Sequence, residues 1–184
     1  MTRLLCIFTI IALLCLAFIN QRASYTSKQT KKYINPFDTL KYDKVIAYDY
    51  NGSPEMQIVI NGKVMPLKER MFKQAELTKE QINKFNKTIG DTKSYGGGTA
   101  SCFDPHFGIV YFKQNKIVGH ISICLGCNFL ESIPDIPAEN SHKTDLCDEC
   151  YANGFSKSGR KNISALVKEL QFSHWQLSDG FFDK

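Results

Sequence analysis

The sequence predicts an α+β fold, in which a small antiparallel sheet built from hairpins is covered by two helices. β-Branched and aromatic runs are separated by turn dipeptides, two segments have apolar residues at helical spacing, and no internal period indicates a repeat array. The 184 residues are 43% hydrophobic and 22% charged, so the chain can bury an ordinary core and is not expected to be disordered.

Residues 1–23 are typical of an export signal. Arg3 precedes an apolar run from Leu4 to Ile19, a polar exit follows, and Ala23 offers a small residue for cleavage. The apolar run has 16 residues, slightly fewer than the roughly 20 that span a bilayer, and an uncleaved N-terminal anchor stays the alternative. We therefore expect a secreted protein or one of the periplasm or cell envelope.

Residues 24–43 are polar and carry clustered lysines, which predicts a tether between the export signal and the fold. A sharper alternative is a basic patch that touches an anionic membrane. Loss of residues 1–23 lowers the formal charge from +5 to +3, because two arginines and no acid leave. Since this charge is modest, nucleic acid is not an expected partner.

A single α+β domain is predicted over residues 44–184, with two hairpins. Asn61-Gly62 is the dipeptide best suited to a two-residue hairpin turn, because both of its positions need a positive φ. Residues 113–116 separate a second pair of runs rich in Ile, Val and aromatic residues. The expected strands are Lys44–Tyr50, Met56–Ile60, Lys63–Leu67, Gly108–Phe112 and Ile117–Cys124.

Two helices are predicted in the same domain. Thr78 and Gln81 form a capping-box pattern at the start of a helix from Thr78 to Ile89. A second helix, Lys161–Gln171, has its apolar residues on one face and is expected to cover the sheet. The glycines of Tyr95–Thr99 and the prolines of residues 128–145 predict loops.

Two Cys-x-x-Cys pairs carry the strongest chemical signal. Cys124 and Cys127 are separated from Cys147 and Cys150 by 19 residues, and such paired turns suit a tetrahedral Zn²⁺ site with four thiolates. Export into an oxidising compartment favours disulfides instead, and four cysteines allow three pairings. Both interpretations stay open, so the expected cofactor is either none or a structural zinc ion.

Cys102 and His106 offer a competing metal site. Both precede the second predicted hairpin, and Cys124 and Cys127 follow it. Because an antiparallel hairpin brings its outer ends together, these four side chains are expected to lie close to one another. A zinc site of Cys102, His106, Cys124 and Cys127 therefore competes with the four-cysteine site.

The functional prediction follows from these cysteines. We expect an exported, cysteine-stabilised domain with a binding or structural role toward an unidentified protein or small molecule. One alternative is a thiol-disulfide oxidoreductase that uses Cys124 and Cys127, although two prolines soon after this pair argue against the usual following helix. The other is a zinc-binding interaction module. No sequence motif identifies a catalytic nucleophile together with a general base, which argues against an enzyme.

The stretch from Cys102 to Leu130, with Gly154–Ile163, resembles a group of small, uncharacterised exported bacterial proteins. Their core reads as Cys, Pro, His, a β-hairpin and then Ile-Cys-x-x-Cys. This resemblance brings no known activity. It implies that five residues belong to one site: Cys102, Pro105, His106, Cys124 and Cys127.

Overall fold

The computed structural model describes residues 33–52, 56–65, 70–144, 146 and 152–174. Its helices are α2 (Pro36–Thr39), α3 (Lys79–Gly90) and α4 (Lys157–Glu169), with 3-10 helices η2 (Thr92–Ser94) and η3 (Pro137–Ser141). Its strands are β1 (Lys44–Tyr50), β2 (Val59–Ile60), β3 (Lys63–Val64), β4 (Met71–Glu76), β5 (Tyr95–Gly97), β6 (Phe107–Lys113), β7 (Lys116–Cys124), β8 (Phe129–Ile133) and β9 (Gly154–Phe155).

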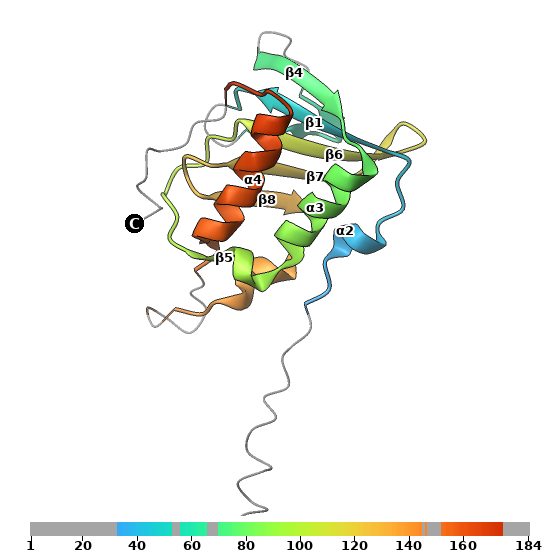
Figure 1. Ribbon diagram of the computed structural model, residues 1–184. Helices are drawn as coiled ribbons and strands as arrows, with labels where there is room; N and C mark the ends of the chain where they lie inside the picture. The colour runs from blue at the N-terminus through green and yellow to red at the C-terminus, as the bar shows by residue number, and fades with distance from the viewer. Residues whose placement is uncertain (1–32, 53–55, 66–69, 145, 147–151, 175–184) are drawn as a thin grey trace, which may run out of the picture. The chain divides into compact units, whose positions relative to one another are not determined.

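The predicted α+β class is confirmed. Five strands form an antiparallel sheet in the order β4-β1-β6-β7-β8, and α3 and α4 pack together in front of it (Figure 1). Two small two-stranded sheets, β2-β3 and β5-β9, lie beside this main sheet. Both expected hairpins are present, because β2 pairs with β3 and β6 pairs with β7.

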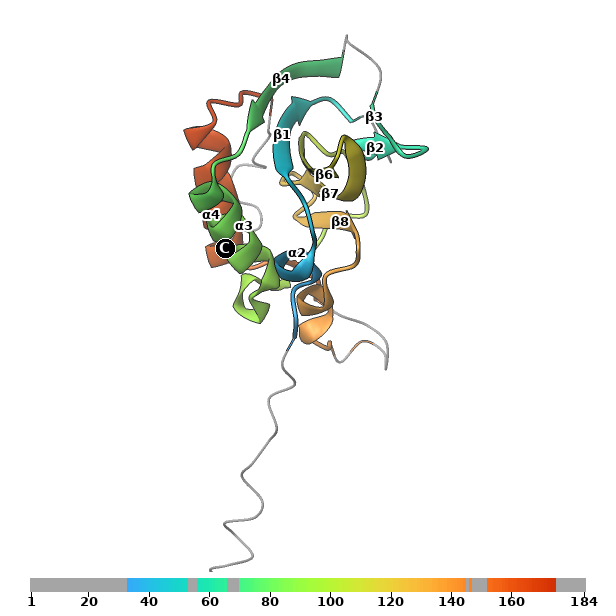
Figure 2. The same cartoon turned by 90° about the vertical axis from the view of Figure 1, so that its right-hand side faces the viewer.

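Both faces of the main sheet are covered, as Figure 2 shows with the helices on one side and β2-β3 on the other. Successive side chains of a strand point to opposite faces. Ala47, Ile109 and Ile121 accordingly join the cluster that packs under the helices, whereas Tyr48 and Val110 pack with the β2-β3 side. This double cover explains why the three central strands, β1, β6 and β7, are largely apolar and buried.

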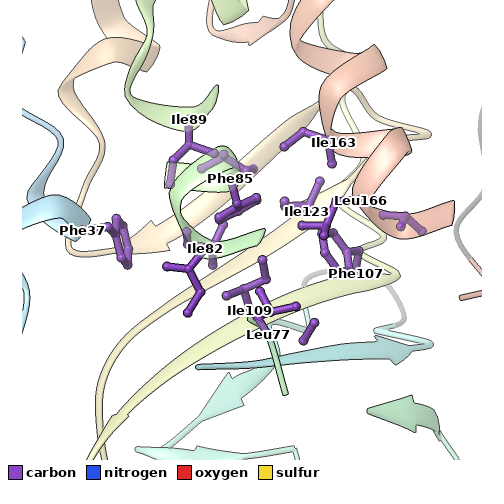
Figure 3. Close-up of a cluster of buried hydrophobic side chains, with 14 of the residues drawn as sticks. Phe37, Leu77, Ile82, Phe85, Ile89, Phe107, Ile109, Ile123, Ile163 and Leu166 are labelled. Carbon is purple, nitrogen blue, oxygen red and sulfur yellow. The ribbon is translucent and has the colours of Figure 1, made fainter. Parts of the chain in front are cut away.

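The larger core lies between the sheet and the two long helices (Figure 3). Both helices bury apolar side chains in this core, at the three- and four-residue spacing that the sequence predicts. The buried residues labelled in Figure 3 are Phe37, Leu77, Ile82, Phe85, Ile89, Phe107, Ile109, Ile123, Ile163 and Leu166.

The predicted capping box at the start of α3 is confirmed. The Thr78 hydroxyl accepts a hydrogen bond from the backbone N–H of Gln81, and the Gln81 side chain accepts one from the N–H of Thr78. Helix α4 begins at Lys157, four residues before its predicted start, with Ser156 as N-cap. The sequence places the start of this helix too late because Gly159 is unfavourable in a helix. A Cβ at this position would collide with the backbone of Ser94, so glycine is needed for close packing.

Part of the segment expected to be a tether is packed into the domain. Asn35 caps the short helix α2, and Phe37 within that helix is fully buried in the larger core. Phe37 lies in a mainly polar stretch that has no helical or strand periodicity, which is why composition alone indicates a tether here. Residues 1–32, which include the predicted export signal and the rest of the tether, lie outside the described residues.

Two expectations about loops need correction. Residues 128–145 contain the edge strand β8, which pairs with β7 and stops before Pro134. Tyr95–Thr99 contains β5, which pairs with β9 across a long sequence separation. The sequence does not predict strand β4, at the opposite edge of the main sheet, because most of its side chains are exposed and polar positions interrupt any apolar run.

In the described part of the chain, no helix is long and apolar enough to cross a membrane.

Candidate functional site

Three cysteine sulfurs meet at one end of the β6-β7 hairpin. Cys124 ends β7, and its sulfur forms a disulfide with that of Cys127 in the turn before β8. Cys102, in the loop before β6, is a free and exposed thiol. Its Sγ atom lies 3.0 Å from the Sγ atom of Cys127. A bonded pair of sulfurs therefore has a third sulfur in contact with it.

The hairpin register brings these loops together, as antiparallel pairing led us to expect. Phe107 at the start of β6 is opposite Ile123 near the end of β7. One further bond joins the loops beyond the strands: the backbone N–H of Ala100 donates to the carbonyl oxygen of Cys127 at 2.9 Å. The position of Cys102 beside the pair is thus a consequence of strand pairing.

Backbone amides point at both sulfurs of the bonded pair. The N–H of Cys127 donates to Cys124 Sγ at 2.9 Å, and the N–H of Asp104 donates to Cys127 Sγ at 3.4 Å. A hydrogen bond to sulfur stabilises the negative charge of a thiolate. Each amide therefore favours release of its sulfur as a thiolate when the disulfide opens.

The three sulfurs differ sharply in exposure. Cys124 and Cys127 are each 2% exposed and pack against Phe103, with Phe129 at the edge of this cluster. The rings of Phe103 and Phe129 lie 4.9 Å apart between their centroids. Because Cys102 is exposed, a molecule in solution reaches the trio first through this thiol.

A buried arginine from α4 holds the Cys-x-x-Cys turn. The Nη1 atom of Arg160 donates to the carbonyl oxygen of Leu125 at 2.7 Å and to Asn128 Oδ1 at 2.8 Å. Asn128 is fully buried with a φ of 68°, and its Nδ2 atom donates to the carbonyl oxygens of Gly98 and Phe155. We call Arg160 and Asn128 the turn clamp. Sequence reasoning missed it, although asparagine after a turn is a known signal for positive φ.

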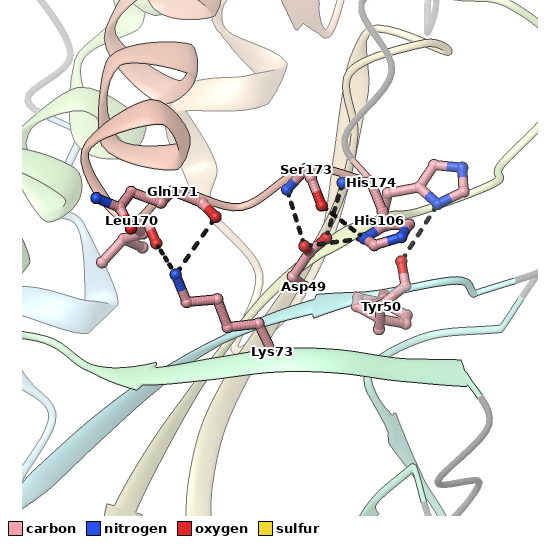
Figure 4. A network of polar contacts seen from close by, with 8 residues as sticks. All are labelled: Asp49, Tyr50, Lys73, His106, Leu170, Gln171, Ser173 and His174. Carbon is pink, nitrogen blue, oxygen red and sulfur yellow. Dashed lines mark hydrogen bonds and ion pairs between the residues drawn. The ribbon is translucent and has the colours of Figure 1, made fainter.

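His106 lies in the same loop as Cys102 but is engaged elsewhere. Its Nδ1 atom is 3.2 Å from the carbonyl oxygen of Tyr50, a contact that Figure 4 shows, and its Nε2 atom is 3.6 Å from Asp104 Oδ2. The ring is thereby fixed between β1 and the loop. His106 thus shares a loop with Cys102, but its ring contacts Tyr50 and Asp104 and is not gathered with the three sulfurs as the predicted zinc site would require.

Within the described ranges, no group of three or more His, Cys, Asp or Glu side chains is arranged to hold a metal ion. Cys147 and Cys150 lie outside those ranges. A zinc site that uses this second pair accordingly stays a prediction.

A second polar network fixes the chain that leaves α4 (Figure 4). The carboxylate of Asp49, which is 1% exposed, accepts hydrogen bonds from the backbone N–H groups of Ser173 and His174 and contacts His174 Nδ1 at 3.1 Å. The Lys73 ammonium group donates to the carbonyl oxygen of Leu170 at 2.9 Å, near the end of the helix. This network anchors the residues after α4 to β1 and β4.

Glu139 is the described carboxylate whose proton affinity departs most from the ordinary value. It lines a cavity of about 420 Å³ together with Glu131 and Asp135. Burial raises the pKa of Glu139 to about 8 from 4.5, and the charges of Asp135 and Glu131 raise it further. The folded protein therefore keeps this proton up to about pH 8, whereas the unfolded chain releases it near pH 4.5.

The free energy of unfolding should consequently fall as the pH rises from about 5 to about 9, because the folded state binds the Glu139 proton more tightly. Glu139→Gln should remove on the order of 2 kcal/mol of this fall, a figure that allows for partial solvent screening. Urea unfolding at both pH values measures it, with Glu76→Gln on the exposed edge strand as control. An equal pH dependence in wild type and both variants would contradict the prediction.

Comparison of the chain with known protein families, with characterised proteins and with solved structures finds no match. The resemblance to exported bacterial proteins thus stays a prediction, and the role of this site depends on the geometry of its three sulfurs.

Proposed function

We propose that this protein is an exported thiol-disulfide exchange domain whose redox pair is Cys124 and Cys127. One observation carries the proposal: the free thiol of Cys102 lies 3.0 Å from a sulfur of the bonded pair. Thiol-disulfide exchange begins with the approach of a thiolate to a disulfide sulfur. The trio therefore has the reactants of an exchange step already in contact.

The length of the closed loop also supports exchange over stabilisation. Cys124 and Cys127 are three residues apart, so their disulfide constrains the unfolded chain only slightly, by about 2 kcal/mol in the chain-entropy account. A bridge between Cys102 and Cys127, which are 25 residues apart, would constrain it by about 3.5 kcal/mol. The observed bridge is thus expected to stabilise the fold less than a bridge between Cys102 and Cys127 would.

A structural role is the second candidate, and burial favours it. Both bonded sulfurs are 2% exposed and contribute to an apolar cluster. A disulfide of that kind resists reduction and adds stability without turnover. The two functions differ in reduction potential, which makes them separable by experiment.

The test is equilibration of the full chain in glutathione buffers, followed by alkylation and peptide mass mapping. We expect the bridge between Cys124 and Cys127 to open with a midpoint above about −300 mV, in the range of exchange proteins. The chain should also oxidise a synthetic peptide that carries two thiols, and Cys127→Ser, which removes the sulfur in contact with both Cys124 and Cys102, should abolish this oxidation. A midpoint below about −300 mV together with no turnover would leave the structural role.

The second Cys-x-x-Cys pair offers the matched control. A double variant, Cys147→Ser with Cys150→Ser, keeps the three sulfurs of the proposed site and should keep peptide oxidation. Loss of oxidation in this double variant with retention in Cys127→Ser would move the redox centre to the second pair and overturn the assignment.

A further inference from the structure

We propose that the disulfide migrates within the trio, so that Cys102 becomes the entry point for a client that carries two thiols. This inference rests on the proposed exchange function and assigns a separate task to each sulfur. Cys102 is the attacking and client-facing sulfur, Cys127 is the central sulfur, and Cys124 is the leaving sulfur.

Contact distance identifies the central sulfur. Cys102 Sγ lies 3.0 Å from Cys127 Sγ, so this atom of the bonded pair is in place for attack. The Asp104 amide also points at Cys127 Sγ, at 3.4 Å, and stabilises the charge that develops there when this sulfur later departs.

The leaving sulfur is already supported. Cys124 Sγ accepts a hydrogen bond of 2.9 Å from the backbone N–H of Cys127. When the bond between the two sulfurs breaks, the electron pair that stays on Cys124 is stabilised by this amide, and a more stable thiolate leaves faster. The turn clamp holds the amide in position from both sides.

Exposure decides where the client enters. Cys124 and Cys127 are each 2% exposed, whereas Cys102 is exposed, so a bulky thiol cannot reach the pair directly. Migration of the bridge to Cys102 and Cys127 brings one sulfur of the disulfide to the surface. The buried oxidising equivalent thereby becomes available to a protein in solution.

The client supplies both electrons that reduce the disulfide, in three exchange steps. The Cys102 thiolate attacks Cys127 Sγ, a new bond forms between them, and Cys124 leaves as a thiolate that takes up a proton. A client thiolate attacks Cys102 Sγ, which forms a mixed disulfide and releases Cys127 as a thiolate. The second client thiolate then attacks its partner's sulfur, which forms the client disulfide and frees Cys102. The client loses two electrons and two protons, and the pair gains them.

The same geometry selects the client class. In the mixed disulfide, the released Cys127 thiolate stays near Cys102 and can reverse the reaction within the molecule. Such an intramolecular attack has a high effective concentration. A client with one thiol is therefore returned, whereas a second thiol on the same client competes as an intramolecular nucleophile. We assign peptides and proteins with paired thiols as the substrates.

The test compares oxidation of a synthetic dithiol peptide by wild type and Cys102→Ser, both as full chains. We expect Cys102→Ser to lose at least about 100-fold in rate, since the buried pair has lost its entry thiol, while its thermal midpoint stays unchanged. Ser101→Ala, in the same exposed loop, is the matched control and should oxidise the peptide at the wild-type rate.

A second variant tests migration without turnover. In Cys124→Ser treated with oxidised glutathione, we expect peptide mapping to find a disulfide between Cys102 and Cys127. Absence of that bridge in a folded variant would overturn the relay, as would a wild-type oxidation rate in Cys102→Ser. In the latter case, exchange by the pair itself would still stand, whereas a wild-type chain that does not oxidise the peptide would end the proposed function as well.

Discussion

Arg160→Met should lower the free energy of unfolding by about 3 kcal/mol, because two buried carbonyl acceptors lose a charged donor. The guanidinium group is 2% exposed and donates to Leu125 O and Asn128 Oδ1 at 2.7 and 2.8 Å. Methionine keeps much of the side-chain volume, so the effect reports mainly on hydrogen bonding. Urea unfolding monitored by circular dichroism measures it.

Two control variants define the meaning of this result. Lys161→Met changes the next, exposed residue of α4 and should alter stability by less than about 0.5 kcal/mol. Arg160→Lys keeps the charge but cannot reproduce the planar group of donors, so it should fall between wild type and Arg160→Met. If Arg160→Met unfolded at the wild-type urea concentration, the turn clamp would not be a source of stability.

Phe37→Ala should cost about 3–5 kcal/mol, the usual range for removing a fully buried phenylalanine. Phe37 is 0% exposed in the larger core, and its ring centroid lies 4.9 Å from that of Tyr111. Alanine leaves a cavity between α2 and the sheet that the rigid strands cannot fill. The measurement is again the free energy of unfolding in urea.

Ile34 provides the matched control for this experiment. It lies three residues earlier in the same segment, and its side chain is 63% exposed. Ile34→Ala should therefore change the free energy of unfolding by less than about 0.5 kcal/mol. If both variants were equally mild, this segment would behave as the tether that its composition predicts.

Local signals account for the parts of the fold that the sequence predicts correctly. The Asn61-Gly62 turn and the capping box of Thr78 and Gln81 each act within a few residues, and both form as expected. Strand β5 and helix α2 depend on partners that lie far away in the chain. A sequence window around either segment contains mostly glycines or polar residues and gives no sign of those partners.

The candidate site, too, is predicted from the sequence only where local geometry determines it. Hairpin geometry predicts that Cys102 lies near Cys124 and Cys127, because strand pairing fixes the positions of the flanking loops. The turn clamp joins Asn128 to Arg160 across 32 residues, and nothing in the local pattern connects them. The spacing of the cysteines therefore predicts which sulfurs lie together. The contacts that hold their turn could be found only in the folded structure, because they come from helix α4.

The turn clamp has a consequence for the order of events during synthesis. Asn128 leaves the ribosome 32 residues before Arg160, while Cys124 and Cys127 are only three residues apart. The short loop can close as soon as it meets an oxidant, before its supporting helix exists. Arg160 can donate to this turn only when α4 has docked, so the supported turn belongs to the finished protein. Under the proposed exchange function, nascent chains would carry the disulfide before they could transfer it to a client.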